Sequence, residues 1–338
     1  MRLGYFANVV NEGTVDDIVA SARDAEADGY HTLWAPQIFS HDALTALAVV
    51  GREVPRIELG TSVVPTYPRH PLMLAQQCQT VSAASGGRLC LGIGLSHKMV
   101  IENMFGMSFD KPVRHMREYL EVLSAAVHDG SVSHDGEVYS VHAGINVNGA
   151  QPFPILIAAL GEQMLRLAGS AADGTITWMT GPATLRNHVT PTITAAAVEA
   201  DRPPPRIVAA LPVCVTDDVK AARTWAAKAF QVYGQLPSYR AMLDREGAEG
   251  PADVAIIGNE DEVVDRVGAL ADAGVTDFGV AEFSTRGDDS ARARAAIRTL
   301  LSLRPFRSGG CRTRYPAIRR IQLGQAGAVA VSDRVCSR

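Results

Sequence analysis

The sequence predicts an α/β fold, a (β/α)8 TIM barrel with an inserted hairpin segment after the fourth βα unit. Three observations support this prediction. Short apolar runs alternate with helical patterns along most of residues 1–303, which gives about eight βα units. The strand-like runs are short and evenly spaced, and no dinucleotide-binding fingerprint follows the first one. A doubly wound sheet is the alternative, and the last two observations favour the barrel.

The first four units each consist of a strand and a helix. The strands are expected at residues 2–9, 31–35, 56–64 and 87–94. The helices are expected at residues 14–30, 42–54, 70–85 and 113–130. Thr14 suits the N-cap of the first helix and Gly29 suits its C-cap. Pro71 lies near the first turn of the third helix, where its missing N–H is tolerated.

The alternation breaks at residues 131–154, where turn dipeptides separate alternating apolar residues. Asp135-Gly136 and Asn148-Gly149 are typical turn signals. We therefore predict an inserted hairpin over about residues 131–152. Tyr139 and His142 of this segment are candidates for lining a substrate pocket.

The second half resumes the alternation. Strands are expected at residues 155–160, 174–180 and 206–216, and the last strand ends the segment 261–283. Helices are expected at residues 161–173, 183–200, 217–234 and 239–247, and at the start of the segment 261–283. Residues 1–303 therefore form a single barrel domain. Residues 304–338 hold eight arginines and one acidic residue, which predicts a loosely ordered C-terminal extension; a nucleic-acid-binding arm is the alternative.

Composition limits the classes of function. The chain is 47% hydrophobic and 20% charged with a net charge of −4, so no basic field attracts nucleic acid. Its five cysteines are scattered and show neither metal-ligand spacing nor a disulfide framework. The sequence shows no signal-peptide pattern and no apolar stretch long enough for a bilayer. We expect a cytoplasmic protein that acts on a small molecule and binds no metal, membrane or nucleic acid.

The stretch GGRLCLGIGLSHKMV, residues 86–100, suggests a binding loop. A predicted strand runs into Gly92-Ile93-Gly94, which is typical of a turn that cradles a phosphate. The dinucleotide fingerprint needs a third glycine where His97 stands, and the P-loop spacing is absent. If the loop ends the fourth barrel strand, His97 and Lys98 can donate hydrogen bonds to an anion; a solvated turn is the alternative.

The functional residues of a barrel gather at the C-terminal ends of its strands. The segments after the second to sixth strands are residues 35–42, 62–71, 94–98, 159–162 and 178–182. They carry glycine, hydroxyl and imidazole groups. Such groups can supply backbone N–H donors and a few cations to one elongated, anionic ligand that contains a ring.

Four motifs at these strand ends, GTSVVPTYPRHP, GGRLCLGIGLSHK, AALG and DGTITWMTGP, resemble those of the luciferase-like (β/α)8 superfamily. Within it, they more closely resemble the actinobacterial oxidoreductases of the branch that depends on coenzyme F420. The resemblance covers residues 1–303 and implies a homodimer. It implies a deazaflavin across the barrel mouth, with the insertion helping to cover the site. It also implies a non-prolyl cis peptide at about Ser62-Val63, beneath the deazaflavin ring.

The resemblance and the strand ends together give a set of predicted cofactor contacts. These contacts are Gln37, Ser62, Val63, Arg69, His70, Gly94, Leu95, Ser96, His97, Lys98, Ala159, Leu160, Gly161, Trp178, Met179 and Thr180. Residues 94–98 correspond to the family's loop for the cofactor tail, and residues 159–161 to its glycine turn beside the ring. For Arg69 and His70, capping of the following helix is the alternative role.

One departure from the family bears on the chemistry. In the sugar-phosphate and alcohol dehydrogenases of the F420-dependent branch, the second strand ends in an Asp-His pair whose histidine handles the proton. Here the corresponding residues are Gln37 and Ile38. Isoleucine carries no proton, so reduction of an activated C=C or C=N bond is favoured over alcohol oxidation. Gln37, His41 and Trp178 remain as candidates for a catalytic role.

Two other functions stay open at this point. One is an FMN-dependent monooxygenase on the same barrel, because reduced FMN activates dioxygen whereas a deazaflavin transfers hydride. The other is a non-catalytic protein that binds F420 or a flavin, which the Ile38 departure supports.

Overall fold

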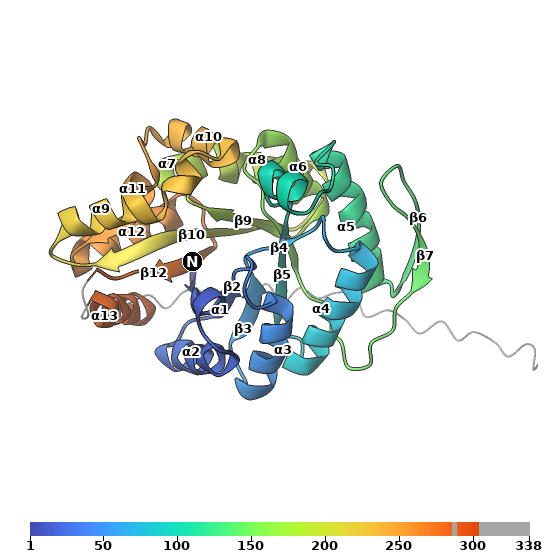
Figure 1. Ribbon diagram of the computed structural model, residues 1–338, viewed down its shortest axis with the longest axis horizontal. Helices are drawn as coiled ribbons and strands as arrows, with labels where there is room; N and C mark the ends of the chain where they lie inside the picture. Colours follow the sequence, from blue (N-terminus) through green and yellow to red (C-terminus); the bar gives the residue numbers. More distant parts are fainter. Residues whose placement is uncertain (286–288, 304–338) are drawn as a thin grey trace, which may run out of the picture. The chain divides into compact units, whose positions relative to one another are not determined.

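A computed structural model describes residues 1–285 and 289–303 of the chain (Figure 1). Eight parallel strands form a closed barrel, because the last of them pairs with the first. In barrel order they are β1 (Arg2–Phe6), β2 (Thr32–Ala35), β3 (Glu58–Thr61), β5 (Leu89–Gly94), β8 (Ile155–Ile157), β9 (Gly174–Trp178), β10 (Arg206–Val215) and β12 (Asp277–Glu282). The prediction of a (β/α)8 barrel is confirmed.

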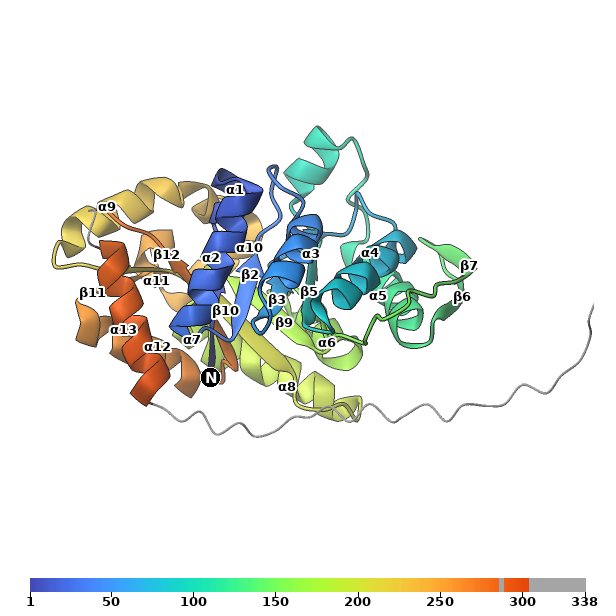
Figure 2. The same ribbon diagram turned by 90° about the horizontal axis from the view of Figure 1, so that it is seen from below.

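Helices surround the strands, and neighbouring helices such as α2, α3 and α4 lie side by side (Figure 2). The α-helices are α1 (Val9–Glu12), α2 (Val15–Asp28), α3 (Ala43–Glu53), α4 (Pro71–Ser85), α5 (Pro112–His128), α6 (Glu162–Ala171), α7 (Pro182–Thr184), α8 (Thr190–Glu199), α9 (Val219–Ala229), α10 (Pro237–Glu246), α11 (Pro251–Val254), α12 (Glu260–Asp272) and α13 (Asp289–Leu303). The shorter helical turns are η1 (Val100–Met104), η2 (Leu185–Val189) and η3 (Gln231–Gly234).

The predicted caps of α2 are present. The Thr14 hydroxyl accepts a hydrogen bond from the Asp17 N–H at 3.2 Å, and the Asp17 carboxylate accepts one from the Thr14 N–H at 2.9 Å. This reciprocal capping box fixes where the helix begins. Gly29 ends the helix with a φ of 91°, a left-handed conformation that glycine adopts without a steric penalty.

Two predicted elements are interrupted. The strand expected at residues 56–64 ends at Thr61 and continues as β4 (Val64–Pro65), which pairs with β5. The helix expected at residues 183–200 consists of α7, η2 and α8 in succession. The sequence patterns also missed α1, α11 and β11 (Ile256–Gly258), because elements this short show no periodicity.

An antiparallel hairpin of β6 (Ser131–Asp135) and β7 (Ser140–Gly144) lies between α5 and β8 in sequence. Glu118 of α5 holds its turn, since its carboxylate accepts hydrogen bonds from the backbone N–H groups of residues 137–139. The hairpin lies beside α5 at the edge of the view in Figure 1. Tyr139 packs against His70 and Tyr119, so it faces the helices.

The core has two layers. Inside the barrel lies a cluster of Phe6, Trp34, Cys90, Leu156, Ile176, Val208, Ala210 and Ala281. A larger apolar cluster fills the space between the strands and the helices. Among the described helices, none is both long and apolar enough to cross a membrane. The predicted arginine-rich extension, residues 304–338, lies outside the described residues.

A network of charged groups closes the N-terminal end of the barrel. Arg206 donates to both oxygens of Asp277, at 3.0 and 2.7 Å, and to both oxygens of Glu58, at 3.1 and 2.6 Å. Arg2 and Thr32 donate to the same Glu58 oxygen, at 2.9 and 2.6 Å. Bidentate arginine–carboxylate pairs are the strongest class of such contacts. The end of the barrel opposite the strand C-termini is therefore tied together by charge.

Candidate functional site

A cavity of about 680 Å³ lies at the C-terminal ends of the barrel strands. Its lining includes residues on or directly after β1, β2, β3, β5, β8, β9 and β12, and residues between β10 and α10. This is the face on which a TIM barrel carries its active site. The cavity is therefore the candidate functional site.

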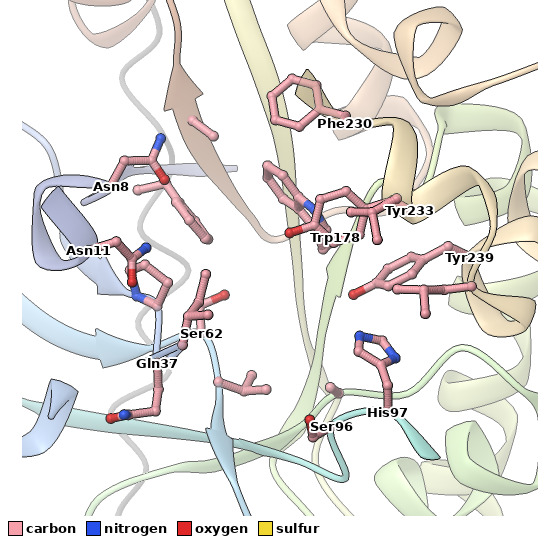
Figure 3. Close-up of a pocket in the computed structure, with 18 of the residues that line it drawn as sticks. Asn8, Asn11, Gln37, Ser62, Ser96, His97, Trp178, Phe230, Tyr233 and Tyr239 are labelled. Carbon is pink, nitrogen blue, oxygen red and sulfur yellow. The ribbon is translucent and has the colours of Figure 1, made fainter. Parts of the chain in front are cut away.

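Two kinds of side chain face each other across the cavity (Figure 3). Asn8 follows β1, Asn11 lies in α1 and Gln37 follows β2, and together they form an amide side. The opposite, aromatic side is formed by Trp178, Phe230, Tyr233, Tyr239 and the imidazole of His97. The site can thus hold a flat ring between aromatic contacts and hydrogen-bonding groups.

Trp178 is the centre of the aromatic side. Its ring stacks on Phe6 with centroids 5.3 Å apart and an interplanar angle of 20°. Phe230 and Tyr233 meet it edge-on, at 6.1 and 5.9 Å. Tyr239 extends the wall and lies edge-on to Tyr233 at 5.2 Å. This packing fixes the position of the indole at the end of β9.

On the amide side, one side-chain carbonyl oxygen accepts a hydrogen bond within the protein and another does not. The Gln37 Oε1 accepts a hydrogen bond from the Ala43 N–H at 2.7 Å, which anchors Gln37 to the start of α3. The Asn11 Oδ1 is buried and accepts no hydrogen bond from the described residues. A buried acceptor without a partner is unfavourable in the isolated chain and suits a ligand that donates an N–H.

The floor of the cavity contains the Ser62–Val63 peptide bond, which is cis as the resemblance implies. A Cβ added at Gly92 would lie 2.1 Å from the Thr61 carbonyl oxygen, and one added at Gly94 would lie 2.6 Å from Val63 Cγ2. The two glycines therefore let β5 approach the backbone around this bond. Gly94 is not among the residues that line the cavity, and its missing side chain makes room for Val63.

The loop after β5 presents neutral groups to the cavity. Burial lowers the pKa of the His97 imidazole below its usual range, so His97 is neutral at neutral pH. Its ring lies 5.7 Å from that of Tyr239. Lys98 is exposed, and its Nζ lies 3.6 Å from a Glu102 carboxylate oxygen. His97 and Ser96 thus offer neutral hydrogen-bonding groups to the cavity.

The predicted site residues divide into two groups. Those that line the cavity are Gln37, Ser62, Val63, Ser96, His97, Leu160 and Trp178. Those that the structure does not place in its lining are His41, Arg69, His70, Gly94, Leu95, Lys98, Ala159, Gly161, Met179 and Thr180. Tyr139 and His142 of the hairpin are also absent from the lining.

Several residues outside the lining have other partners. The His41 Nε2 lies 2.8 Å from the Gly13 carbonyl oxygen. The Arg69 guanidinium donates to Asp42, the N-cap of α3, at 2.7 Å, and His70 caps α4. Met179 is fully buried in the core. His70 therefore has the alternative role, capping of the following helix, whereas Arg69 pairs with the N-cap residue of α3.

Sequence reasoning missed two groups of lining residues. Asn8 and Asn11 follow the first strand, and the strand-end rule that identified Gln37 would have found them. Tyr233 lies in η3 and Tyr239 lies in the first turn of α10, in the part of the chain that follows α9 and reaches over the barrel mouth. Their positions depend on the path of a long connection, and no local pattern in the sequence reveals that path.

Comparisons with known proteins agree with the predicted family and fold. The sequence profile of the luciferase-like monooxygenase family matches residues 1–300. A 5,10-methylenetetrahydromethanopterin reductase of Methanolobus tindarius is 30% identical over 288 residues, which cover 83% of this chain and 86% of that protein. An F420-dependent glucose-6-phosphate dehydrogenase of Amycolatopsis mediterranei is 30% identical over 190 residues, or 52% of this chain and 57% of that protein.

A solved structure shares the fold. The coenzyme F420-dependent tetrahydromethanopterin reductase of Methanopyrus kandleri matches with a TM-score of 0.74 at 22% identity. The match covers 88% of this chain and 96% of that chain. At this level of identity the likeness concerns the arrangement of the barrel.

Proposed function

The chain belongs to the luciferase-like monooxygenase family, and we propose that it is an oxidoreductase that uses coenzyme F420 to reduce an activated C=C or C=N bond. The F420-dependent dehydrogenase among its relatives supports the choice of cofactor. The observation that carries the proposal is the cavity at the barrel mouth, where an aromatic wall faces amide side chains above the cis Ser62–Val63 bond. A small organic molecule is the proposed substrate.

The residues present fit a deazaflavin ring. Its flat faces suit the wall of Trp178 and the Val63 side chain, both of which line the cavity. Its polar edge carries hydrogen-bond donors and acceptors, and the unpartnered Asn11 Oδ1 can accept from an N–H of such an edge. Ser96 and His97 can donate hydrogen bonds to the anionic tail.

When bound, the deazaflavin supplies the hydride. Trp178 and Val63 would hold the ring plane, and Asn8 and Asn11 would fix its orientation. The neutral His97 can donate one hydrogen bond through an imidazole nitrogen without adding charge. Orientation by these groups lowers the entropic barrier to the transfer.

The absence of an acid or base at position 38 supports reduction over alcohol oxidation. An alcohol must lose its O–H proton to a base as hydride leaves its carbon, and the isoleucine at the end of β2 cannot accept that proton. His41 does not replace the missing base, because it is bonded to Gly13 and is not part of the cavity lining. An electron-poor C=C bond that receives hydride can take its proton from water.

A cofactor titration tests the proposal. Trp178 and Trp225 line the cavity and are two of the three tryptophans, so their fluorescence reports binding. F420 and FMN are added separately to the full-length protein, and saturable quenching by F420 is the expected result. Saturation by FMN without saturation by F420 would overturn the cofactor assignment.

Turnover tests the reaction. Reduced F420 is mixed with an enone, 2-cyclohexenone, and with a cyclic imine, and reoxidation of the cofactor is followed by absorbance. Consumption of either substrate with matching reoxidation is expected. Tight F420 binding without turnover of any compound in a broad enone and imine panel would favour a binding protein instead.

A further inference from the structure

Nearly half of the exposed large apolar side chains in the described part of the protein line one cavity. Thirteen large hydrophobic side chains are exposed in the described part of the chain, and six of them line the cavity. We call these six the apolar rim: Ile38, Phe39, Met99, Phe105, Trp225 and Val232. Their exposed fractions run from 40% for Phe105 to 60% for Phe39. Apolar surface concentrated at one opening marks a site of contact with another molecule.

The apolar rim has two sides, both continuous with the interior of the cavity. Phe39 follows β2 and Phe105 follows η1, and their rings contact edge-on with centroids 6.3 Å apart. On the other side, Trp225 of α9 stacks on Phe283 at 4.8 Å and 9°. Phe283 itself lines the cavity. An apolar ligand that leaves the cavity therefore meets apolar side chains on two sides.

The charges of the lining oppose the binding of an anionic substrate. Among the described residues, neither lysine nor arginine lines the cavity, and the two carboxylates that do belong to Glu12 and Glu282. The Glu282 carboxylate accepts a hydrogen bond from the Tyr30 hydroxyl at 3.0 Å. His97 contributes no charge, because burial lowers the pKa of its imidazole. A second anion beside the cofactor tail would therefore find no cation among the described lining residues to offset its desolvation.

We propose that the substrate of this site is an uncharged molecule with an extended apolar part that lies against the apolar rim. The inference rests on the proposed function for the place where the reaction occurs, and it adds the substrate class. Each methylene group buried against the rim stabilises the complex, roughly fourfold in affinity when burial is complete. Affinity should therefore rise with the length of the apolar part and fall when a carboxylate replaces an uncharged head group.

Three ligands of matched structure test the substrate class. Nonan-2-one is uncharged and long, butan-2-one is uncharged and short, and nonanoate is long and anionic. Each is titrated into the full-length protein with oxidised F420 present, and binding is followed by tryptophan fluorescence and by calorimetry. Nonan-2-one should bind at least about 30-fold more tightly than either of the other two. Equal or tighter binding of nonanoate would overturn the proposal.

Rim variants locate the contact. The double variant Phe39→Ser and Phe105→Ser removes exposed side chains, so the fold should be unaffected. The affinity ratio of nonan-2-one to butan-2-one should fall about tenfold in this variant. Val198→Ser is the matched control, because Val198 is 73% exposed on α8 and is not among the lining residues. A ratio that stays the same in the double variant would refute the role of the apolar rim.

A second copy of the chain is the competing occupant of the apolar rim. The molar mass in solution is therefore measured for the native protein and the double variant. A mass that halves in the variant would show that the rim is buried between copies, and would overturn the proposal. If F420 fails to bind while the ketone ratios are as expected, the proposed function fails and the substrate class stands. If F420 binds but nonan-2-one and butan-2-one bind equally well, the proposed substrate class fails and the proposed cofactor stands.

Discussion

Replacing Glu58 by Gln should destabilise the barrel by an amount that depends on pH. Burial alone would raise the pKa of the Glu58 carboxyl, but Arg206 and Arg2 outweigh burial and lower that pKa from 4.5 to about 2. The side chain is 22% exposed, so solvent screens it little. A difference of this size corresponds to about 3 kcal/mol of stability when the carboxyl is fully ionised.

The sign of the pH dependence follows from the lowered pKa. A carboxyl whose folded-state pKa is depressed stabilises the protein above its unfolded pKa, and that stability is lost as pH falls toward the folded pKa. Glu58 should contribute about 3 kcal/mol at pH 7 and about 2 kcal/mol at pH 3.5. Gln has the shape of the protonated acid, so the Glu58→Gln variant should lack this dependence.

Urea unfolding at pH 7 and pH 3.5, followed by circular dichroism, measures the free-energy difference between the native protein and the variant. The control is Glu53→Gln on α3, since Glu53 pairs with Arg23 on the surface with both side chains more than half exposed. Its effect should stay below about 1 kcal/mol at pH 7. A Glu58→Gln difference that does not shrink between pH 7 and pH 3.5 would show that the charge of Glu58 is not the cause.

Three further outcomes follow from the site. Gly92→Ala should destabilise the protein by about 1–3 kcal/mol in urea and weaken F420 binding, because its Cβ meets the Thr61 carbonyl. Gly161→Ala is the control for the stability measurement, because no atom lies within 4 Å of the new Cβ. Trp178→Leu should weaken F420 binding about tenfold in equilibrium dialysis, and an unchanged Kd would remove Trp178 from the ring contact. Arg69→Met should lower the free energy of unfolding by about 1 kcal/mol, because the hydrogen bond to Asp42 is lost. The Kd of this variant for F420 should equal the native value, and a raised Kd would show that Arg69 contacts the cofactor.

The barrel could be predicted because its signals are local and repeated. Thr14 and Gly29 bound α2 through side-chain and backbone preferences that are legible in the sequence. The position of the cis bond at Ser62–Val63 came from the resemblance, since no propensity in the chain indicates it. Local sequence preferences therefore predicted the helices and strands, whereas the cis peptide bond in the site was predicted only from the resemblance to a family.

Several predicted contact residues have partners within the protein, and two of these partners, Asp42 for Arg69 and Val63 for Gly94, are distant in sequence. Arg69 and Lys98 have the charge that an anion site needs, but Asp42 and Glu102 engage them away from the cavity. Gly94 was interpreted from its neighbours in the sequence, whereas a side chain at this position would meet Val63, which lies between β3 and β4. A sequence shows which groups can bind a ligand, and only packing shows which of them are already occupied.

The charged residues that stabilise the barrel and the residues that line the cavity lie at opposite ends of the same strands. Glu58 begins β3 and Ser62 follows its last residue, while Asp277 begins β12 and Ala281 near its end lines the cavity. Because the base network and the cavity share strands without sharing side chains, Glu58→Gln should leave the Kd for F420 unchanged at pH 7 in the folded protein. Equal loss of stability and of F420 affinity in that variant would mean that the charges at the base set the geometry of the mouth, and that the two ends are coupled through the barrel.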